Sequence, residues 1–396
     1  MPEIKLSVRE LVEFILREGD IDYRFGGMER AQEGARIHRR LQKAAGPEYK
    51  AEVPFVFRHA LDGVVFTVEG RADGIISEPT GPVVDEIKTT YMPLDRITEA
   101  SNAVFWAQAQ CYAHFYLGQN NLPEMVVQLT YFYVPTQQIC RYRRRFSREE
   151  LSEFYESLLM QYKAWSDWKE AWEAQRNRSA GQLSFPFSFY RPGQRELAAA
   201  VYRAVRDKDR IFCQAPTGIG KTISTLFPSV KAVGEGLAEK IFYLTAKTVT
   251  RQAAGDALSI MAGKGLRLKS MFLTAKDKIC FLEQRNCNPD ACPYAKGHYD
   301  RINEALFGLL QSGDQFGREE IEAAARTHMV CPYELSLDLC NWCDCVVCDY
   351  NYLFDPQTRL RRFFSEKQRG EYVFLIDEAH NLADRAREMF SARIRK

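Results

Sequence analysis

Hydrophobic and polar residues in the first half of the chain alternate between helical and strand spacing. A capping-box pattern at 7–10 precedes apolar residues at helical intervals over 11–16, which predicts a helix that begins after Ser7. Apolar residues at every second position over 64–68, then a turn rich in Pro and Gly at 78–82, predict two adjacent strands. The same logic predicts helices near 31–41 and 103–116 and strands over 83–88, 126–134 and 139–146.

A second capping box, at 147–150, predicts the start of a long amphipathic helix. The helix carries an apolar stripe, which we expect to pack into a core: Leu151, Tyr155, Leu158, Tyr162 and Trp165. The polar run over 173–182 that follows is predicted to be a linker. This places one domain at 1–178 and another at 179–396.

The second domain alternates predicted strands and helices, as α/β folds do. Strands are expected over 211–214, 240–245 and 372–376, with a long cysteine-bearing insert between the last two. We therefore predict an α/β fold class, with two α/β domains in one chain.

Composition narrows the classes of function. The 396 residues include 54 Lys and Arg against 52 Asp and Glu, a net charge of +2, so bulk positive charge cannot drive nucleic-acid binding. The longest apolar runs fall far short of a membrane span, and 1–5 does not resemble a secretion signal. We expect a cytoplasmic protein without a membrane partner. Eight of the 11 cysteines lie between Cys280 and Cys348, a spacing that in a reducing cytosol favours metal binding over disulfides.

The residues 215–222, Ala-Pro-Thr-Gly-Ile-Gly-Lys-Thr, follow a predicted strand and precede a predicted helix. This is the context of a phosphate-binding loop, in which Gly218 and Gly220 let backbone N–H groups approach phosphate oxygens. Lys221 would neutralise phosphate charge, and the Thr222 hydroxyl would bind Mg²⁺. The sequence thus predicts a site for ATP and Mg²⁺.

A matching acidic pair ends the apolar strand at 372–376. Asp377 is expected to reach the Mg²⁺ ion, and Glu378 to orient or deprotonate the attacking water. The pair begins an Asp-Glu-Ala-His box. With Ala215 as its first residue, the loop resembles that of superfamily 2 helicases. The resemblance implies that Gln194, in Arg-Pro-Gly-Gln, reads adenine and that 244–248 touches the DNA backbone.

Four cysteines of the insert are candidate ligands, with the spacing C-x6-C-x4-C-x38-C: Cys280, Cys287, Cys292 and Cys331. Four thiolates can hold an iron–sulfur cluster or a tetrahedral zinc ion, and zinc sites more often use C-x2-C pairs, which these four lack. An insert closed by Cys-Pro-Tyr between the loop and the acidic box resembles the XPD/DinG helicases. The resemblance implies a [4Fe–4S] cluster within about 265–340, beside the path of single-stranded DNA. Zinc and free thiols remain the alternatives.

A second cysteine group includes two C-x2-C pairs: Cys340, Cys343, Cys345 and Cys348. The neighbouring run 346–353 resembles a strand and loop of the same helicases in which no metal is bound. We expect these four thiols to be buried without a metal, and a second metal site is the alternative.

The first domain carries a separate set of polar residues. Asp73 and the Glu86-x-Lys88 pair lie on adjacent predicted strands, where two carboxylates can bind Mg²⁺ or Mn²⁺ and the lysine can position water. His38 lies on the preceding helix and Gln108-x-x-x-Tyr112 on the following one.

In this order the elements resemble the RecB-like branch of the PD-(D/E)xK nucleases. The resemblance implies that His38, Asp73 and Glu86 are metal ligands and that Lys88 is catalytic. The alternative is an ordinary solvated hairpin or a nuclease fold without activity. Three arginines on one strand face are candidates for phosphate contacts or for a solvated surface: Arg141, Arg143 and Arg145.

Together these resemblances predict an ATP-dependent helicase with a fused nuclease, which acts on single-stranded or forked DNA in repair or processing. Sixteen residues follow His380, too few for a second RecA-like lobe, so we expect weak ATP binding and no unwinding by this chain alone. The alternatives are a DNA-binding module with an inactive nuclease fold and a zinc-stabilised nucleotide switch without motor function.

Overall fold

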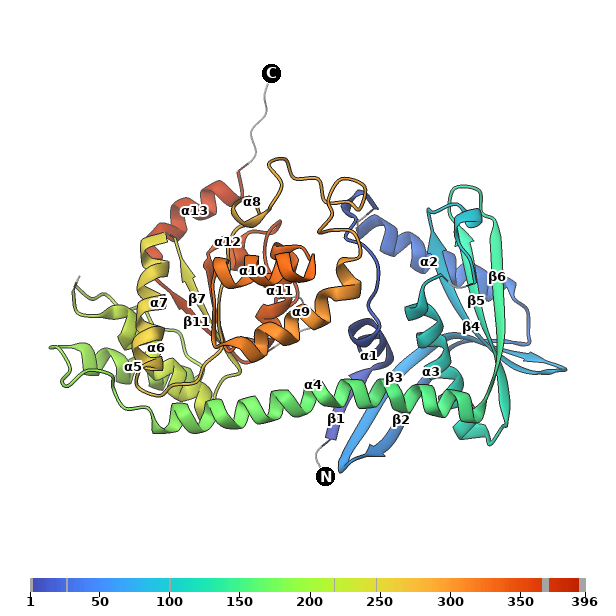
Figure 1. The fold of residues 1–396 in the computed structure, drawn as a ribbon, viewed down its shortest axis with the longest axis horizontal. Helices are drawn as coiled ribbons and strands as arrows, with labels where there is room; N and C mark the ends of the chain where they lie inside the picture. Colours follow the sequence, from blue (N-terminus) through green and yellow to red (C-terminus); the bar gives the residue numbers. More distant parts are fainter. Residues whose placement is uncertain are drawn as a thin grey trace, which may run out of the picture. The chain divides into compact units, whose positions relative to one another are not determined.

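The computed structural model describes residues 3–25, 28–99, 101–216, 218–246, 248–364 and 370–391. The chain forms two compact units. The first unit comprises residues 1–167 together with 287–300, and the second comprises 168–286 together with 301–396. Each unit combines helices with a β-sheet (Figure 1), which confirms the predicted α/β fold class.

The first unit is built on a six-stranded sheet in the order β1-β3-β4-β5-β6, with β2 paired to β3. The strands are β1 Glu3–Ser7, β2 Tyr49–Leu61, β3 Val64–Glu78, β4 Gly81–Thr90, β5 Glu124–Tyr133 and β6 Ile139–Ser147. Strand β4 pairs with β3 in antiparallel and with β5 in parallel orientation. The expected strands therefore form, and the turn at 78–82 places the C-terminal half of β3 beside β4.

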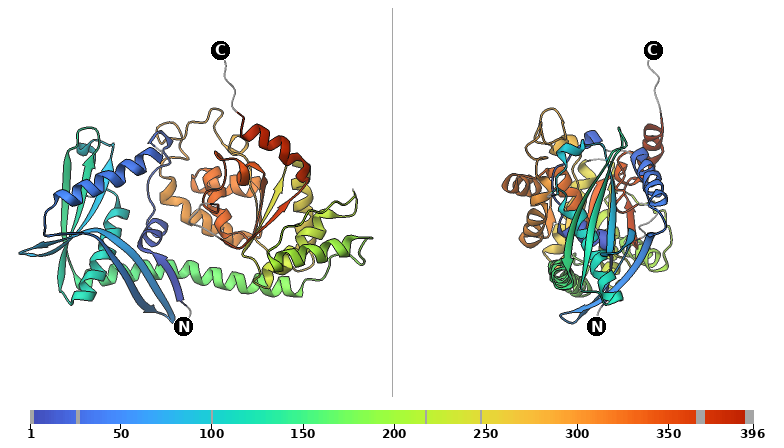
Figure 2. Two further views of the ribbon diagram at one scale, coloured as in Figure 1. Left: turned by 180° about the vertical axis from the view of Figure 1, so that it is seen from behind. Right: turned by 90° about the vertical axis from the view of Figure 1, so that its right-hand side faces the viewer.

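Helices cover both faces of this sheet (Figure 2). They are α1 Val8–Ile15, η1 Tyr23–Phe25, α2 Met28–Ala44, η2 Leu94–Arg96, α3 Ala103–Asn120 and α4 Arg148–Gln182. Successive residues of a strand point to opposite faces. Lys88 contacts Gln108 of α3, whereas a Cβ added at Gly34 of α2 would meet Thr89. The two helices therefore lie on opposite faces of β4.

The apolar stripe of α4 lies in the core as predicted. Leu151, Tyr155 and Leu158 are at most 1% exposed. Further along the helix, Trp165 makes an edge-on ring contact with Phe14 at 5.0 Å between centroids. The aromatic residues of this stripe thus serve packing within the first unit.

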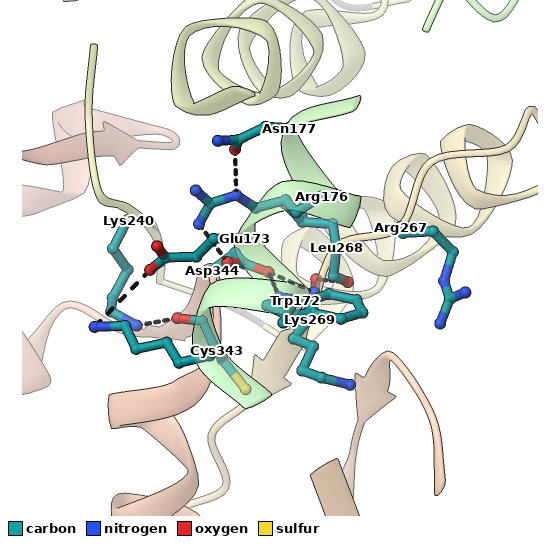
Figure 3. Close-up of polar contacts among 12 residues, drawn as sticks. Trp172, Glu173, Arg176, Asn177, Lys240, Arg267, Leu268, Lys269, Cys343 and Asp344 are labelled. Atoms are coloured by element: carbon teal, nitrogen blue, oxygen red, sulfur yellow. Dashed lines mark hydrogen bonds and ion pairs between the residues drawn. The ribbon is translucent and has the colours of Figure 1, made fainter. Parts of the chain in front are cut away.

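The predicted linker over 173–182 is wrong, because α4 continues as helix to Gln182 (Figure 1). The residues of α4 from Trp168 onward belong to the second unit. There the buried Asp344 carboxylate accepts hydrogen bonds from Trp172 Nε1 at 3.0 Å and Arg176 Nη1 at 2.8 Å (Figure 3). A distant residue therefore holds a polar segment in helical form.

The second unit contains a parallel sheet in the order β11-β7-β10-β8-β9. The strands are β7 Lys240–Thr245, β8 Ser270–Phe272, β9 Gln315–Phe316, β10 Cys345–Asp349 and β11 Tyr372–Ile376. The helices are α5 Gln194–Asp207, α6 Lys221–Gly234, α7 Thr248–Ala262, α8 Lys276–Ile279, α9 His298–Ser312, α10 Arg318–His328, α11 Pro332–Trp342, α12 Asn351–Phe354, η3 Ala379–Asn381 and α13 Leu382–Met389, of which α9 begins in the first unit. Strand β7 is fully buried, as expected for a strand with neighbours on both sides.

The strand expected at 211–214 does not form. Phe212 is 96% exposed, and none of the described strands pairs with this segment. Apolar residues make a strand possible, but a ladder also needs a neighbouring backbone, which tertiary structure must supply. Among the described residues, no helix combines the length and the apolar character needed to cross a bilayer.

Candidate nucleotide and metal sites

The predicted phosphate-binding loop leads into the N-terminus of α6. Gly218 and Gly220 have positive φ angles of 85° and 82°, a region that side chains with a Cβ rarely adopt. Gly220 is the N-cap of α6, so the first helical residues are Lys221 and Thr222. Unpaired N–H groups at a helix N-terminus favour anions, so the local geometry suits phosphate. Thr217 lies outside the described residues.

The acidic strand end lies beside this loop. Lys221 Nζ is 3.3 Å from Glu378 Oε1. The N–H of Asp377 donates to the Leu244 carbonyl at 3.0 Å, which extends the pairing of β11 with β7. Burial raises the pKa of Asp377, and the neighbouring Glu378 charge acts in the same direction. The structure therefore brings together the lysine and the two carboxylates predicted from the sequence.

Tyr243 is a member of this site that sequence reasoning missed. It lies on β7, is 2% exposed, and shares hydrogen bonds with Thr222 and Asp377. Burial, followed by the Asp377 charge, raises the pKa of its phenol. Its phenol thus links the first turn of α6 to the acidic strand end. A tyrosine in an apolar strand carries no sequence signal for such a role.

Gln194 packs against the phosphate-binding loop. It is 3% exposed, and its Oε1 accepts a hydrogen bond from the Arg191 N–H at 3.0 Å. A Cβ added at Gly220 would lie 2.6 Å from Gln194 Nε2, so glycine allows this close approach. The Arg191 guanidinium donates to the Gly218 carbonyl. Contact of Gln194 with adenine stays a prediction, as does the DNA contact at 244–248, where Lys247 lies outside the described part of the chain.

The polar residues of the first unit converge around β3 and β4. His38 Nδ1 is 3.4 Å from Asp73 Oδ1, and the other carboxylate oxygen of Asp73 accepts the Ile87 N–H at 2.7 Å. Lys88 Nζ lies 2.8 Å from Glu86 Oε1 and 3.2 Å from Gln108 Oε1. The structure thus connects residues from α2, β3, β4 and α3 that the sequence had singled out separately.

Glu86 has the chemistry of a metal ligand. It is 2% exposed, and its Oε2 has no hydrogen-bond partner among the described residues. Burial raises the pKa of Glu86 to about 7; Lys88 opposes this shift, and the nearby Asp73 charge adds to it. An unpaired buried carboxylate oxygen is costly, and a divalent cation would satisfy it. Carboxylate oxygens suit Mg²⁺ or Mn²⁺. However, the described residues contain no group of three or more His, Cys, Asp or Glu side chains that could hold a metal ion, so metal binding by Glu86, Asp73 and His38 stays a prediction.

Asp85 anchors the opposite face of β4, and sequence reasoning did not single it out. Its carboxylate accepts hydrogen bonds from Tyr49 OH at 3.1 Å, Gln128 Nε2 at 2.7 Å and Thr130 Oγ1 at 2.5 Å. A Cβ at Gly74 would lie 2.0 Å from the Tyr49 ring. Only a glycine at position 74 leaves enough space for this ring. Burial raises the pKa of Asp85, and its three hydrogen bonds oppose the shift. The network holds the strand that carries Glu86.

Two of the three arginines on one face of β6 form ion pairs. Arg143 lies 2.8 Å from Glu78, and Arg145 pairs with Glu124. These contacts are those of a solvated strand surface, the alternative to phosphate binding.

The four cysteines proposed as cluster ligands are half-buried and free of disulfides. Cys287 and Cys292 belong to the first unit, and Cys280 and Cys331 to the second. In the described ranges, no three or more His, Cys, Asp or Glu residues are gathered into a metal site. The thiol chemistry suits a cluster, and the set of four ligands stays a prediction.

The first unit nevertheless holds the segment 287–300 firmly. The Ile21 N–H donates to the Ala295 carbonyl at 2.9 Å, and the Tyr23 N–H donates to the Cys287 carbonyl at 3.1 Å. This segment of the insert is thus ordered by backbone hydrogen bonds to the connection between α1 and α2.

The second cysteine group is buried, as predicted. Its four thiols are at most 1% exposed: Cys340, Cys343, Cys345 and Cys348. Burial raises the pKa of Cys340 and of Cys345 to about 12, so both remain protonated at neutral pH. Burial of this kind is usual for free cysteines in a protein core, and the expectation that these four bind no metal stays a prediction.

The glycine-rich turn leads into α6, and the acidic pair follows β11 of the parallel sheet. This combination is typical of a P-loop nucleotide-binding domain. Residues 266–396 match the DEAD_2 family model. The chain is 23% identical over 248 residues to the XPD helicase subunit of general transcription and DNA repair factor IIH from Arabidopsis thaliana, covering 54% of this chain and 32% of the relative. These matches make this part of the chain similar to the XPD/DinG-type superfamily 2 helicases.

The chain is also similar to a second curated helicase and to a solved structure. A regulator of telomere elongation helicase 1 homologue from Anopheles gambiae is 35% identical over 266 residues, covering 54% of this chain and 26% of the relative. A solved structure titled XPD_Helicase is 21% identical with a TM-score of 0.36, covering 51% of this chain and 34% of that one. The chain thus spans about a third or less of the length of these curated relatives.

Proposed function

We propose that this protein is an ATP-dependent DNA helicase of the XPD type that acts in DNA repair or processing on single-stranded or forked DNA. The observation that carries the proposal is the 3.3 Å contact between Lys221 Nζ and Glu378 Oε1 beside Asp377. A phosphate-binding lysine and an acidic pair from distant parts of the chain meet at one edge of the sheet. The chemistry of such a site is nucleoside triphosphate hydrolysis.

The residues of the site have distinct tasks in this proposal. Lys221 and the N–H groups of the loop bind the phosphates, while Thr222 and Asp377 hold Mg²⁺. The bound Mg²⁺ would neutralise charge on the phosphate oxygens. Glu378 orients the attacking water and accepts its proton. The pairing of Lys221 with Glu378 keeps both side chains in place before ATP enters.

The Lys221→Ala variant tests this assignment. Loss of the Lys221 ammonium group removes charge-assisted hydrogen bonds to phosphate, so the affinity for Mg-ATP should fall about 10- to 100-fold. Titration with a fluorescent ATP analogue measures the affinity, and this chain alone is expected not to separate the strands of forked DNA with or without the substitution. Lys208→Ala, which removes an exposed ion pair with Glu371, is the matched control and should bind like the wild type. A wild-type protein without Mg-dependent ATP binding would refute the proposed function.

We further propose that the first unit is a metal-dependent DNA nuclease. The unpaired buried oxygen of Glu86, beside Asp73 and His38, supports this proposal. In it, Glu86, Asp73 and His38 hold the ion, and Lys88 positions the attacking water. The ion would stabilise negative charge on the phosphate that is cut. The competing candidate is a DNA-binding module that does not cleave.

We also propose that a [4Fe–4S] cluster binds Cys280, Cys287, Cys292 and Cys331. Their spacing without C-x2-C pairs and their half-buried, disulfide-free state support it. Protein purified without oxygen should contain iron and sulfide, and Cys292→Ser should lower both. Cys213→Ser, at an exposed cysteine outside the insert, is the control and should leave them unchanged. Zinc without iron would reject the cluster and favour a zinc-stabilised insert.

A further inference from the structure

The backbone turns sharply between the two carboxylates that follow β11. Adjacent residues of a continuing strand would point to opposite faces. Instead, Glu378 adopts φ 52° and ψ 48°, in the left-handed region. Its Oε1 thereby lies 3.3 Å from Lys221, while Asp377 shares a hydrogen bond with Tyr243. The left-handed residue lets both carboxylates serve the same phosphate-binding loop.

This conformation is unfavourable for a residue with a Cβ and persists only where its surroundings impose it. Three donors converge on the carbonyl oxygen of Glu378. Tyr350 OH lies at 3.2 Å, the Asn381 N–H at 3.0 Å and Asn381 Nδ2 at 2.9 Å. Tyr350 OH also donates to the Asp377 carbonyl. These hydrogen bonds fix the orientation of the peptide group that follows Glu378.

Both donor side chains are themselves well held. Tyr350 directly follows β10 and is fully buried. The end of β10 is fastened to α13 by Arg385, whose Nη2 lies 2.8 Å from Asp349 Oδ2. Asn381 is the N-cap of α13, and its side-chain Nδ2 donates to the Glu378 carbonyl. Burial raises the pKa of Tyr350 to about 12, which keeps the phenol a donor at neutral pH.

We propose that Tyr350 and Asn381 are positioning residues that hold Glu378 in the left-handed conformation and so direct its carboxylate to Lys221. Neither side chain needs to contact the nucleotide. The role assigned to Glu378 rests on the proposed ATP hydrolysis, whereas the backbone constraint does not. Two experiments separate these parts.

The first experiment compares Glu378→Gly with Glu378→Ala in urea denaturation. Both variants lack the carboxylate, and they differ only in the Cβ that makes the left-handed conformation costly. In the otherwise unchanged protein, the glycine variant should have a folding equilibrium constant about three- to tenfold larger than the alanine variant.

The same pair is then built into a Tyr350→Phe/Asn381→Ala background. With the two donors removed, residue 378 can relax, so the advantage of glycine should vanish or reverse because glycine loses more backbone entropy on folding. An equal advantage in both backgrounds would overturn the proposal, as would alanine being at least as stable as glycine in the unchanged protein. A merely structural role of Tyr350 and Asn381 would lower the stability of both variants equally.

The second experiment measures ATP hydrolysis. Tyr350→Phe and Asn381→Ala should each lower kcat about tenfold and leave KM within about twofold, because the binding residues stay intact. Tyr352→Phe is the control, since that phenol contacts Tyr333 and should turn over ATP like the wild type. Unchanged kcat in both variants would overturn the claim that they direct Glu378. If the wild type does not hydrolyse ATP, the proposed function fails, and the comparison of glycine with alanine still decides the backbone constraint.

Discussion

Glu86→Gln is expected to lower metal-dependent cleavage of single-stranded DNA by about 10³-fold or more. The substitution keeps the size of the side chain but replaces a metal-binding carboxylate oxygen with an amide nitrogen that cannot bind the ion. A metal ion contributes several kcal/mol to transition-state stabilisation, and each 1.4 kcal/mol is about a factor of ten in rate. Cleavage of a labelled single strand in Mn²⁺ or Mg²⁺ measures the effect.

The matched control is Glu78→Gln, on neighbouring strand β3. Glu78 forms an ion pair with Arg143, in which the arginine is 46% exposed, so its loss should leave cleavage close to the wild-type rate. If neither the wild type nor Glu86→Gln cleaves DNA, the result would instead favour the DNA-binding module that does not cleave. The ATP-binding site lies in the other unit, so Glu86→Gln should retain Mg-ATP affinity in either case.

Glu86 should also make the affinity for Mn²⁺ depend on pH. The pKa of Glu86 is raised to about 7, chiefly by burial, and the proton must leave before the carboxylate binds metal. Mn²⁺ affinity should therefore rise with pH through about 7 and fall roughly tenfold per unit below it. The folded metal-free protein holds this proton more tightly than the unfolded chain. The contribution of Glu86 to stability is thus present below pH 4.5 and lost as the pH rises through about 7. Glu86→Gln should flatten the Mn²⁺ titration between pH 6 and 8, and an unchanged slope would contradict the assignment.

Asp344→Ala is expected to destabilise the second unit by about 3–5 kcal/mol, the usual cost of removing one partner from a buried ion pair. Asp344 is 4% exposed and accepts hydrogen bonds from Trp172, Arg176 and the Lys269 N–H, the last at 2.8 Å (Figure 3). Its removal leaves the Arg176 guanidinium, 9% exposed, without its 2.8 Å carboxylate partner. The C-terminal part of α4 would then lose a buried polar contact with the rest of the second unit.

Urea denaturation monitored by tryptophan fluorescence measures this loss, because Trp172 reports directly on the contact. Asp207→Ala removes an exposed ion pair with Arg206 and should leave the free energy of unfolding close to that of the wild type. Equal stability of the two variants would show that Asp344 does not hold α4 in place.

The sequence by itself determined the local features of both candidate sites. The loop at 215–222, the acidic pair after β11 and the Glu86-x-Lys88 pair are short patterns whose chemistry depends on neighbouring residues. Strand alternation alone placed Glu86 and Lys88 on one face of β4. The structure brings these groups together with Asp73 and His38, while their roles stay predictions.

Tertiary structure alone decided the remaining features, because each depends on a partner far away in the chain. In the polar run at 173–182, which is helical, Arg176 pairs with the distant Asp344. The segment 211–214 is not a strand, and none of the described strands pairs with it. Tyr350 constrains Glu378 across 28 positions of sequence. Such partners leave no periodicity or spacing near the residue they act on, so only the folded chain reveals them.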